Sequence, residues 1–184
     1  TLAMDPKNPR VLYAGTTGGA YRSHDSATSW HKVNNGLIPE EVLDASLALG
    51  VNTLVVDPVD SSIVYAGTTN GLFKTTNRAD SWTRIGQSLP DQFISSLAVH
   101  PTQHAILYVG GRAGVLKSAD GGQTWQAMNA GLATLNIRTL VMSPRDPQLL
   151  YAGTNGSGLY RSTDGAATWT RVPLTANTSP PSQP

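Results

Sequence analysis

The stretch SADGGQTW, residues 118–125, decides the fold, because the chain repeats it three more times. Small and polar residues, two of them glycine, lead directly into a tryptophan. This pattern predicts a tight turn that delivers a large aromatic ring to a core. We call each copy a box. The other boxes are SHDSATSW, TTNRADSW and STDGAATW, at residues 23–30, 75–82 and 162–169.

Two further landmarks recur with each box, always in the same order. Apolar runs that end in a turn proline are LAMDP (2–6), LVVDP (54–58), LAVHP (97–101) and LVMSP (140–144). The runs that follow them are LYAGT (12–16), VYAGT (64–68), LYVGG (107–111) and LYAGT (150–154). From the residue before the proline to the tryptophan, the distance is 25, 25, 25 and 26 residues. Four short β-rich runs in a unit of about 43 residues predict a propeller blade.

The sequence therefore predicts an all-β fold, a β-propeller built of four four-stranded antiparallel blades. The expected blades span residues 1–37, 51–89, 94–132 and 137–172. Segment 38–50 is an insertion with weak helical periodicity over 39–49. Residues 173–184 are rich in Pro, Ser and Thr and are expected to form an extended linker or tail.

The composition excludes several classes of protein. The 184 residues carry a net charge of +1 with 13 scattered basic residues, which argues against nucleic acid or an anionic membrane as partner. The absence of cysteine excludes disulfides and thiolate metal sites. No apolar run is long enough to insert into a bilayer. The four histidines show no ligand spacing, so we expect neither a metal nor a cofactor.

The pattern Ser/Thr-x-Asp-x-Gly-x-Thr-Trp resembles the Asp box of the bacterial-neuraminidase-repeat (BNR) propellers. That family includes sialidases, xyloglucan-degrading glycosidases, sortilin-type receptors and photosystem II assembly factors. The resemblance covers residues 1–172, and only the third box matches throughout. The departures are Ala27, Ala79 and Ala166 for Gly, Ser29 and Ser81 for Thr, and Asn77 for Asp. With this family we expect an extracytoplasmic location: secreted, periplasmic or cell-surface.

The substitutions within the boxes favour a scaffold role over catalysis. An Asp in a turn accepts hydrogen bonds from nearby backbone N–H groups, and Asn offers the same acceptor oxygen. A catalytic acid could not be replaced by Asn77, and we expect each tryptophan ring to plug the core. The box residues expected to be structural are Ser23, Asp25, Trp30, Thr75, Asn77, Trp82, Ser118, Asp120, Gly122, Thr124, Trp125, Ser162, Asp164, Thr168 and Trp169.

The resemblance implies that a functional cleft lies on the face opposite the boxes. That face is expected to consist of loops 16–19, 68–71, 111–114 and 154–158 with the connections 34–52, 86–95 and 129–138. A sialidase would need an arginine motif, Phe-Arg-Ile-Pro, which is absent. The two glutamates, Glu40 and Glu41, are adjacent and make a poor acid/base pair. A xyloglucan-type glycosidase uses two aspartates, and Asp44 and Asp91 are the candidates, neither in a distinctive motif.

We therefore expect a non-enzymatic binding module that presents loops to a protein or carbohydrate partner. The alternative is a fragment of a glycoside hydrolase whose catalytic residues lie in blades outside this chain. Arg112 and Arg138 are the only cations expected on the functional face, and Glu40, Glu41 and Asn155 complete the candidate binding residues.

Ring closure poses a separate question, because four blades are fewer than this family usually has. The sequence shows no spare strand to pair the two ends, so each end blade is expected to expose an apolar face. We expect further blades from an absent segment, a partner chain or a second copy that gives eight blades. The alternative is a compact four-bladed ring.

Overall fold

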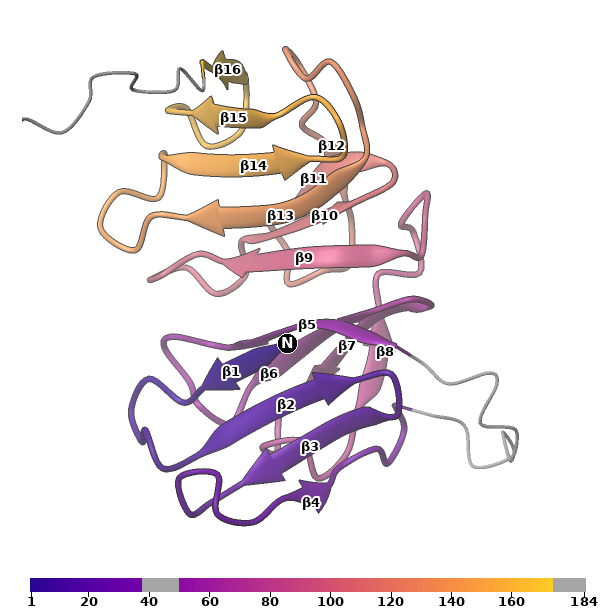
Figure 1. Ribbon diagram of the computed structural model, residues 1–184, viewed down its shortest axis with the longest axis vertical. Helices are drawn as coiled ribbons and strands as arrows, with labels where there is room; N and C mark the ends of the chain where they lie inside the picture. Colours follow the sequence, from indigo (N-terminus) through magenta and orange to yellow (C-terminus); the bar gives the residue numbers. More distant parts are fainter. Residues whose placement is uncertain (38–49, 174–184) are drawn as a thin grey trace, which may run out of the picture.

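The computed structural model describes residues 1–37 and 50–173, which form four four-stranded antiparallel sheets (Figure 1). In every sheet the spatial order of the strands follows their order in the chain. The predicted all-β propeller architecture is confirmed. The expected helix at 39–49, with Glu40, Glu41 and Asp44, and residues 174–184 lie outside the described residues.

The strands fall where the repeat predicts them. The first sheet contains β1 (Leu2–Met4), β2 (Leu12–Thr16), β3 (Gly19–Ser23) and β4 (His31–Lys32). The second contains β5 (Val51–Val56), β6 (Val64–Thr68), β7 (Gly71–Thr75) and β8 (Thr83–Ile85). The third contains β9 (Ile94–Val99), β10 (Leu107–Gly111), β11 (Gly114–Ser118) and β12 (Gln126–Ala127). The fourth contains β13 (Ile137–Met142), β14 (Leu150–Thr154), β15 (Leu159–Ser162) and β16 (Thr170–Val172).

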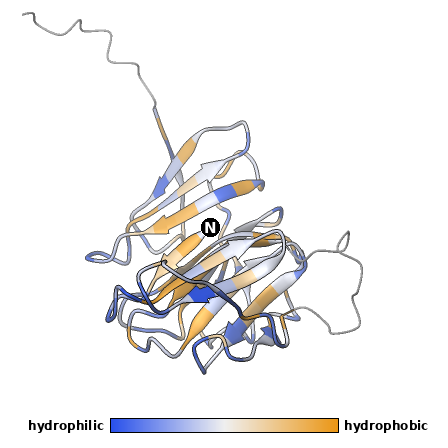
Figure 2. Cartoon of the chain, turned by 60° about the horizontal axis from the view of Figure 1, so that its bottom comes forward, coloured by the Kyte–Doolittle hydropathy of each residue, from blue (hydrophilic) through white to orange (hydrophobic). Residues whose placement is uncertain are grey.

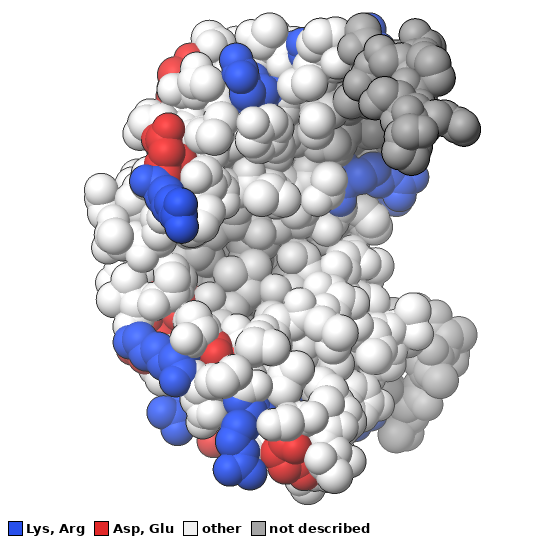
Figure 3. Space-filling model, turned by 60° about the vertical axis from the view of Figure 1, so that its left-hand side comes forward, with Lys and Arg blue, Asp and Glu red and all other residues white. Residues whose placement is uncertain are grey.

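The four sheets are arranged as an arc. The inner strands pack in series, β1 on β5, β5 on β9 and β9 on β13. Viewed nearly along the direction of these strands, the molecule has a notch on one side between its two ends (Figure 3). Leu2 on β1 is 70% exposed and Val141 on β13 is 57% exposed, so neither end face covers the other. The structure is therefore an open arc and not the compact four-bladed ring.

The core lies between neighbouring sheets, where hydrophobic residues follow the strands (Figure 2). The second strands of the two interior sheets, β6 and β10, are buried at every position. Their counterparts β2 and β14 in the end sheets are only partly buried. A strand with a sheet on both sides has no solvent face, which explains its continuous run of small and apolar residues.

The tryptophans of the boxes differ in burial, contrary to the expectation that all four plug the core. Trp82 and Trp169 are buried, whereas Trp125 is half-buried and Trp30 is exposed. The indole Nε1 of Trp82 donates to the Val33 carbonyl of the first sheet at 2.8 Å. The preceding sheet thus covers the ring, and within the described residues no sheet precedes Trp30.

Candidate binding face

The boxes form the turns between the third and fourth strands, and their polar atoms are saturated by internal hydrogen bonds. In the third box, Asp120 Oδ1 accepts from Ser118 Oγ at 2.8 Å and from the amides of Gln123 and Thr124 at 2.9 Å. Its Oδ2 accepts from Thr124 Oγ1 at 2.5 Å. These bonds favour the ionised carboxylate and hold the pKa of Asp120 well below its usual range. Such a carboxylate has no proton to donate at neutral pH.

The remaining boxes repeat this geometry. In the fourth box, hydrogen bonds from the Thr168 hydroxyl and amide lower the pKa of Asp164 to about 2. In the first box, the Ser29 hydroxyl and amide hold the pKa of Asp25 well below its usual range. In the second box, Asn77 Oδ1 accepts from Thr75 Oγ1 at 2.7 Å and from the Ser81 amide at 3.0 Å. Asn77 Nδ2 donates to Ser81 Oγ at 2.9 Å, where an aspartate would accept. The turn thus keeps its shape without a charge.

The opposite ends of the sheets carry the hairpins between second and third strands. Thr68 Oγ1 donates to the Gly71 carbonyl at 2.8 Å, and Thr154 Oγ1 donates to the Gly158 carbonyl at the same distance. These bonds close the hairpins of the second and fourth sheets, whereas Gly111 at the same position of the third sheet has no hydroxyl to donate. The Thr69 amide donates to the Gly50 carbonyl at 2.9 Å. Gly50, which follows segment 38–49, therefore lies at this end of the sheets. We call this end, with the hairpins at 16–19, 68–71, 111–114 and 154–158, the hairpin face.

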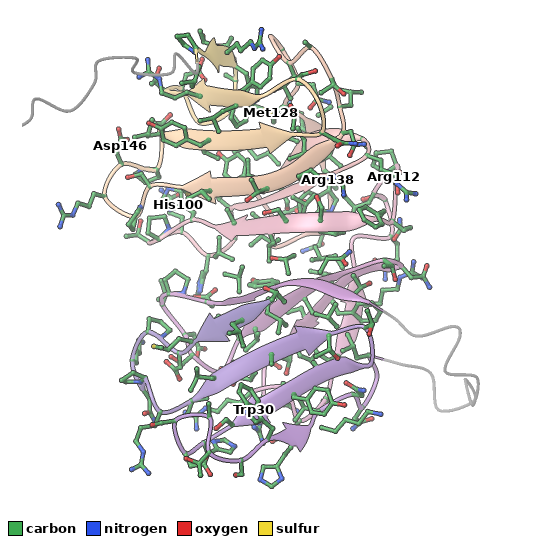
Figure 4. The ribbon with its side chains drawn as sticks, in the orientation of Figure 1. Trp30, His100, Arg112, Met128, Arg138 and Asp146 are labelled. Atoms are coloured by element: carbon green, nitrogen blue, oxygen red, sulfur yellow. The ribbon has the colours of Figure 1, made fainter. Side chains whose placement is uncertain are left out.

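Arg112 and Arg138 lie at the same end of the third and fourth sheets, away from His100 and Asp146 at the box end (Figure 4). The guanidinium carbon of Arg112 lies 4.4 Å from the centroid of the Phe93 ring, in a cation–π arrangement. Arg138 is exposed on β13. The Asn155 amide donates to the Asn136 carbonyl at 2.9 Å, which leaves its exposed side chain at this face.

Two further arginines reach the hairpin face from the outer strands, so Arg112 and Arg138 are not its only cations. Arg84 on β8 donates from Nη2 to Gln92 Oε1 at 3.0 Å, beside Gly71. Arg171 on β16 lies beside Gly158. Arg84 and Arg171 stand at the same position of the repeat, in Thr-Arg-Ile and Thr-Arg-Val. This shared position was the sequence signal that could have placed both arginines on the hairpin face.

Carboxylates are scarce on the hairpin face. Of the described residues, Asp91 alone brings a carboxylate to it, and its Oδ1 accepts the Phe93 amide at 2.7 Å. Within residues 1–37 and 50–173, no group of three or more His, Cys, Asp and Glu side chains could hold a metal ion. The same residues contain no helix that could cross a membrane. The described part of the face therefore offers cations and hairpin backbone for binding, with one engaged carboxylate.

An apolar hollow of about 180 Å³ opens at the box end of the inner strands. It is lined by Val55, Val56, Val99 and Met142 with the turn residues Pro58, Pro101, Ser143 and Pro144. The proline of each repeat thus borders the hollow in three of the sheets. Ser143 is its one hydroxyl, so the hollow has little capacity to orient a polar ligand.

Solved structures similar to this chain include two kinds of protein. The GH74 xyloglucanase from Xanthomonas campestris matches with a TM-score of 0.74 at 22% identity, over 95% of this chain and 30% of that one. The GH74 enzyme from Niastella koreensis matches with a TM-score of 0.69 at 26% identity, over 92% of this chain and 29% of that one. YCF48 bound to D1 peptide matches with a TM-score of 0.64 at 17% identity, over 92% of this chain and 52% of that one.

These matches concern the fold. Much of each larger protein has no counterpart in this chain. The chain spans less than a third of the two GH74 enzymes and about half of YCF48. None of the curated proteins matches its sequence. A family model does match, over residues 7–183, and it describes a propeller. The chain therefore belongs to the family of the DUF6242 beta propeller domain.

Proposed function

We propose that the chain is a non-enzymatic binding module whose hairpin face docks a partner. One observation carries the proposal: the described part of this face has several arginines but a single carboxylate, Asp91, already engaged by the Phe93 amide. Glycoside hydrolysis in its usual form needs two carboxylates across the scissile bond. Binding needs only a rigid surface with charges at fixed positions, and the hairpins supply it.

A protein partner fits this surface better than a glycan. Exposed arginines form bidentate hydrogen bonds with carboxylates, and the sheets hold the backbone of Arg138 on β13 and of Arg112 in the hairpin between β10 and β11. Phe93, an aromatic ring at this face, is half-buried and covered by Arg112. The bound peptide in the YCF48 structure supports the idea that a propeller of this fold can hold a polypeptide segment. A glycan partner is the second candidate.

The alternative function, a fragment of a glycoside hydrolase, draws support from the likeness to the GH74 enzymes. In that case further blades would supply the catalytic carboxylates. The expected extracytoplasmic location stays a prediction, which fractionation of the source cells would test.

A comparison of two faces tests the proposal. The chain should be screened against peptide and glycan arrays, and any ligand found should be titrated against the double variant Arg112→Ala/Arg138→Ala. We expect affinity to fall at least about tenfold, because each lost charged hydrogen bond contributes roughly 1.5–3 kcal/mol. Arg145→Ala is the matched control, since Arg145 is exposed in the turn between β13 and β14 at the box end.

Two outcomes would contradict the proposal. Equal loss of affinity in the Arg145→Ala control would place binding elsewhere. Hydrolysis of xyloglucan or of a fluorogenic sialoside by the isolated chain would make it an enzyme, and loss of that activity in Asp91→Asn would identify its carboxylate.

A further inference from the structure

The second box differs from the other three in the direction of one hydrogen bond. In the first box Ser29 Oγ donates to Asp25 Oδ2 at 2.6 Å, and the third and fourth boxes repeat this bond. In the second box Asn77 Nδ2 donates to Ser81 Oγ at 2.9 Å. The orientation of the Asn77 side chain is fixed, because its Oδ1 accepts the Ser81 amide, which can only donate, at 3.0 Å.

This reversal leaves the Ser81 hydroxyl with a proton to give. A hydroxyl group has one proton to donate and two lone pairs that accept. In the other boxes that proton goes to the aspartate, whereas Ser81 uses a lone pair and no described residue accepts its proton. The second box therefore offers a hydrogen-bond donor where the other boxes carry a negative charge.

Ser81 borders a pocket of about 190 Å³ beside the second box. Its walls come from β7, β8 and the box between them, and the lining residues are Lys74, Thr75, Thr76, Ser81, Thr83 and Ile85. Of these, Lys74 alone is charged. Thr76 and Thr83 are exposed, and their hydroxyls have no hydrogen-bond partner within residues 1–37 and 50–173. The pocket thus combines one cation with several hydroxyl donors and has no carboxylate in its lining.

Lys74 stands at the repeat position of Arg22 but has no acidic partner among the described residues. Arg22 Nη1 lies 2.8 Å from Asp80 Oδ1 of the following box, and the residue that corresponds to Asp80 in the third box is Gln123. Lys74 is half-buried, with its Nζ 5.5 Å from the centroid of the Tyr65 ring. A partly desolvated ammonium group without a counter-ion favours the approach of an anion.

The tryptophan of the third box adopts a different contact beside this pocket. We call the contact between two neighbouring sheets a junction. Trp82 and Trp169 each donate to a carbonyl at the end of the fourth strand in the preceding sheet. The corresponding residue of the second sheet is Ile85, but Trp125 Nε1 donates to the Gly122 carbonyl of its own box at 3.1 Å. Ile85 is free to line the pocket, in a junction between the two interior sheets.

We infer that this pocket binds a small tetrahedral oxyanion, a phosphate or sulfate group. Lys74 supplies the charge, and the hydroxyls of Ser81, Thr76 and Thr83 supply neutral donors. Hydrogen bonds from an ammonium group to such an anion are among the stronger ones in proteins. A tetrahedral anion offers more acceptor oxygens to these donors than a carboxylate does. The site lies at the box end and is independent of the partner proposed for the hairpin face.

Titration calorimetry of the full chain with inorganic phosphate at constant ionic strength measures the site. We expect saturable binding that is at least about tenfold weaker in Lys74→Gln, because a charged hydrogen bond is lost. Lys117→Gln is the matched control and should bind as the native chain does. Lys117 holds the same repeat position, with its Nζ 5.4 Å from the centroid of the Tyr108 ring, but its box contains Asp120.

Asn77→Asp tests the hydrogen-bond argument and leaves Lys74 in place. The variant gives the second box the carboxylate of the other three, so its melting temperature should not fall. Ser81 is then expected to donate to the carboxylate, and the added charge should repel the anion, so phosphate binding should be lost. Unchanged phosphate binding in this variant would overturn the inference.

Further ligands define the chemical class of the anion. Sulfate should compete with phosphate, and acetate should bind more weakly than either. Tighter binding of methyl phosphate than of inorganic phosphate would indicate a phosphoryl group carried on a larger molecule, whereas the reverse order would indicate the free ion, and either order supports the site. Absence of saturable phosphate binding, an equal loss in Lys117→Gln, or acetate binding as tight as that of phosphate would each overturn it.

Discussion

Trp82 and Trp30 hold the same place in the repeat, but Trp82 is 4% exposed and Trp30 is 36% exposed. The local sequences that surround them are similar, and both end a box of the same geometry. The difference lies in the preceding sheet, which accepts the indole N–H of Trp82 and has no counterpart for Trp30 among the described residues. The burial of these two rings therefore depends on the sheet that precedes them and not on the box alone.

Removal of these two rings should show the largest contrast. Trp82→Ala is expected to cost roughly 3–5 kcal/mol of unfolding free energy, because it empties a buried site between two sheets. Trp30→Ala should cost less than half as much, since water already reaches that ring. Urea unfolding of the two variants measures both costs. Equal costs would mean that the box itself, and not the junction, stabilises the ring.

The polar residues of the box should not show this contrast. We expect their contribution to stability to be the same in an end sheet and in an interior sheet. Asp25 and Asp120 make equivalent hydrogen bonds and both have a depressed pKa. A carboxylate with a lowered folded pKa stabilises the protein above its unfolded pKa of about 4, and this contribution is lost as the pH falls toward the folded value. Acid should therefore destabilise the chain progressively below pH 4.

Asn substitution tests this equivalence directly, because the second box already functions with Asn77. Asp25→Asn and Asp120→Asn should each be mild at pH 7 and should each flatten the loss of stability below about pH 4 to the same extent. Unfolding free energies between pH 2 and pH 5 provide the measurement. A larger effect for Asp120→Asn alone would tie the acid response to the junctions as well.

The sequence predicted the strands and turns well because these are local properties of each repeat. Short apolar runs, turn prolines and boxes each depend on residues within a few positions of one another. Contacts between repeats were harder to predict from the sequence, because they depend on residues far apart in the chain. The hydrogen bond from Arg84 to Gln92 depends on how β8 lies beside the next connection. Trp125 turns its indole toward the Gly122 carbonyl of its own box at 3.1 Å and is only half-buried, which its repeat position did not indicate.

His100 provides a smaller, interior test near neutral pH. It stands where the first two turns have an aspartate and the fourth has Ser143, and its Nδ1 accepts the amides of Thr102 and Gln103 at 3.3 and 3.1 Å. Burial, with a lesser effect from Lys117, lowers the pKa of His100 below its usual value of 6.5. The unfolded chain therefore takes up a proton first as the pH falls below about 6.5, and stability is lost there.

His100→Asp should remove this loss, because Asp57 caps the equivalent turn by accepting the amides of Val59 and Asp60. Thermal melts at pH 5 and pH 7.5 should differ less for the variant than for the native chain. An unchanged difference would show that another group titrates in this range.

The smallest predicted effect returns to the contrast between end and interior. Ala27 and Ala79 occupy the box position that favours glycine, with φ of 70° and 71°. A left-handed alanine costs roughly 1–2 kcal/mol, so Ala27→Gly, at an exposed site, should stabilise the chain by about 1 kcal/mol. Ala79 is fully buried, and its methyl group contributes about 0.8 kcal/mol of burial that glycine would lose. Ala79→Gly should therefore be close to neutral in urea unfolding, and an equal gain in both variants would show that the interior junction does not use that methyl group.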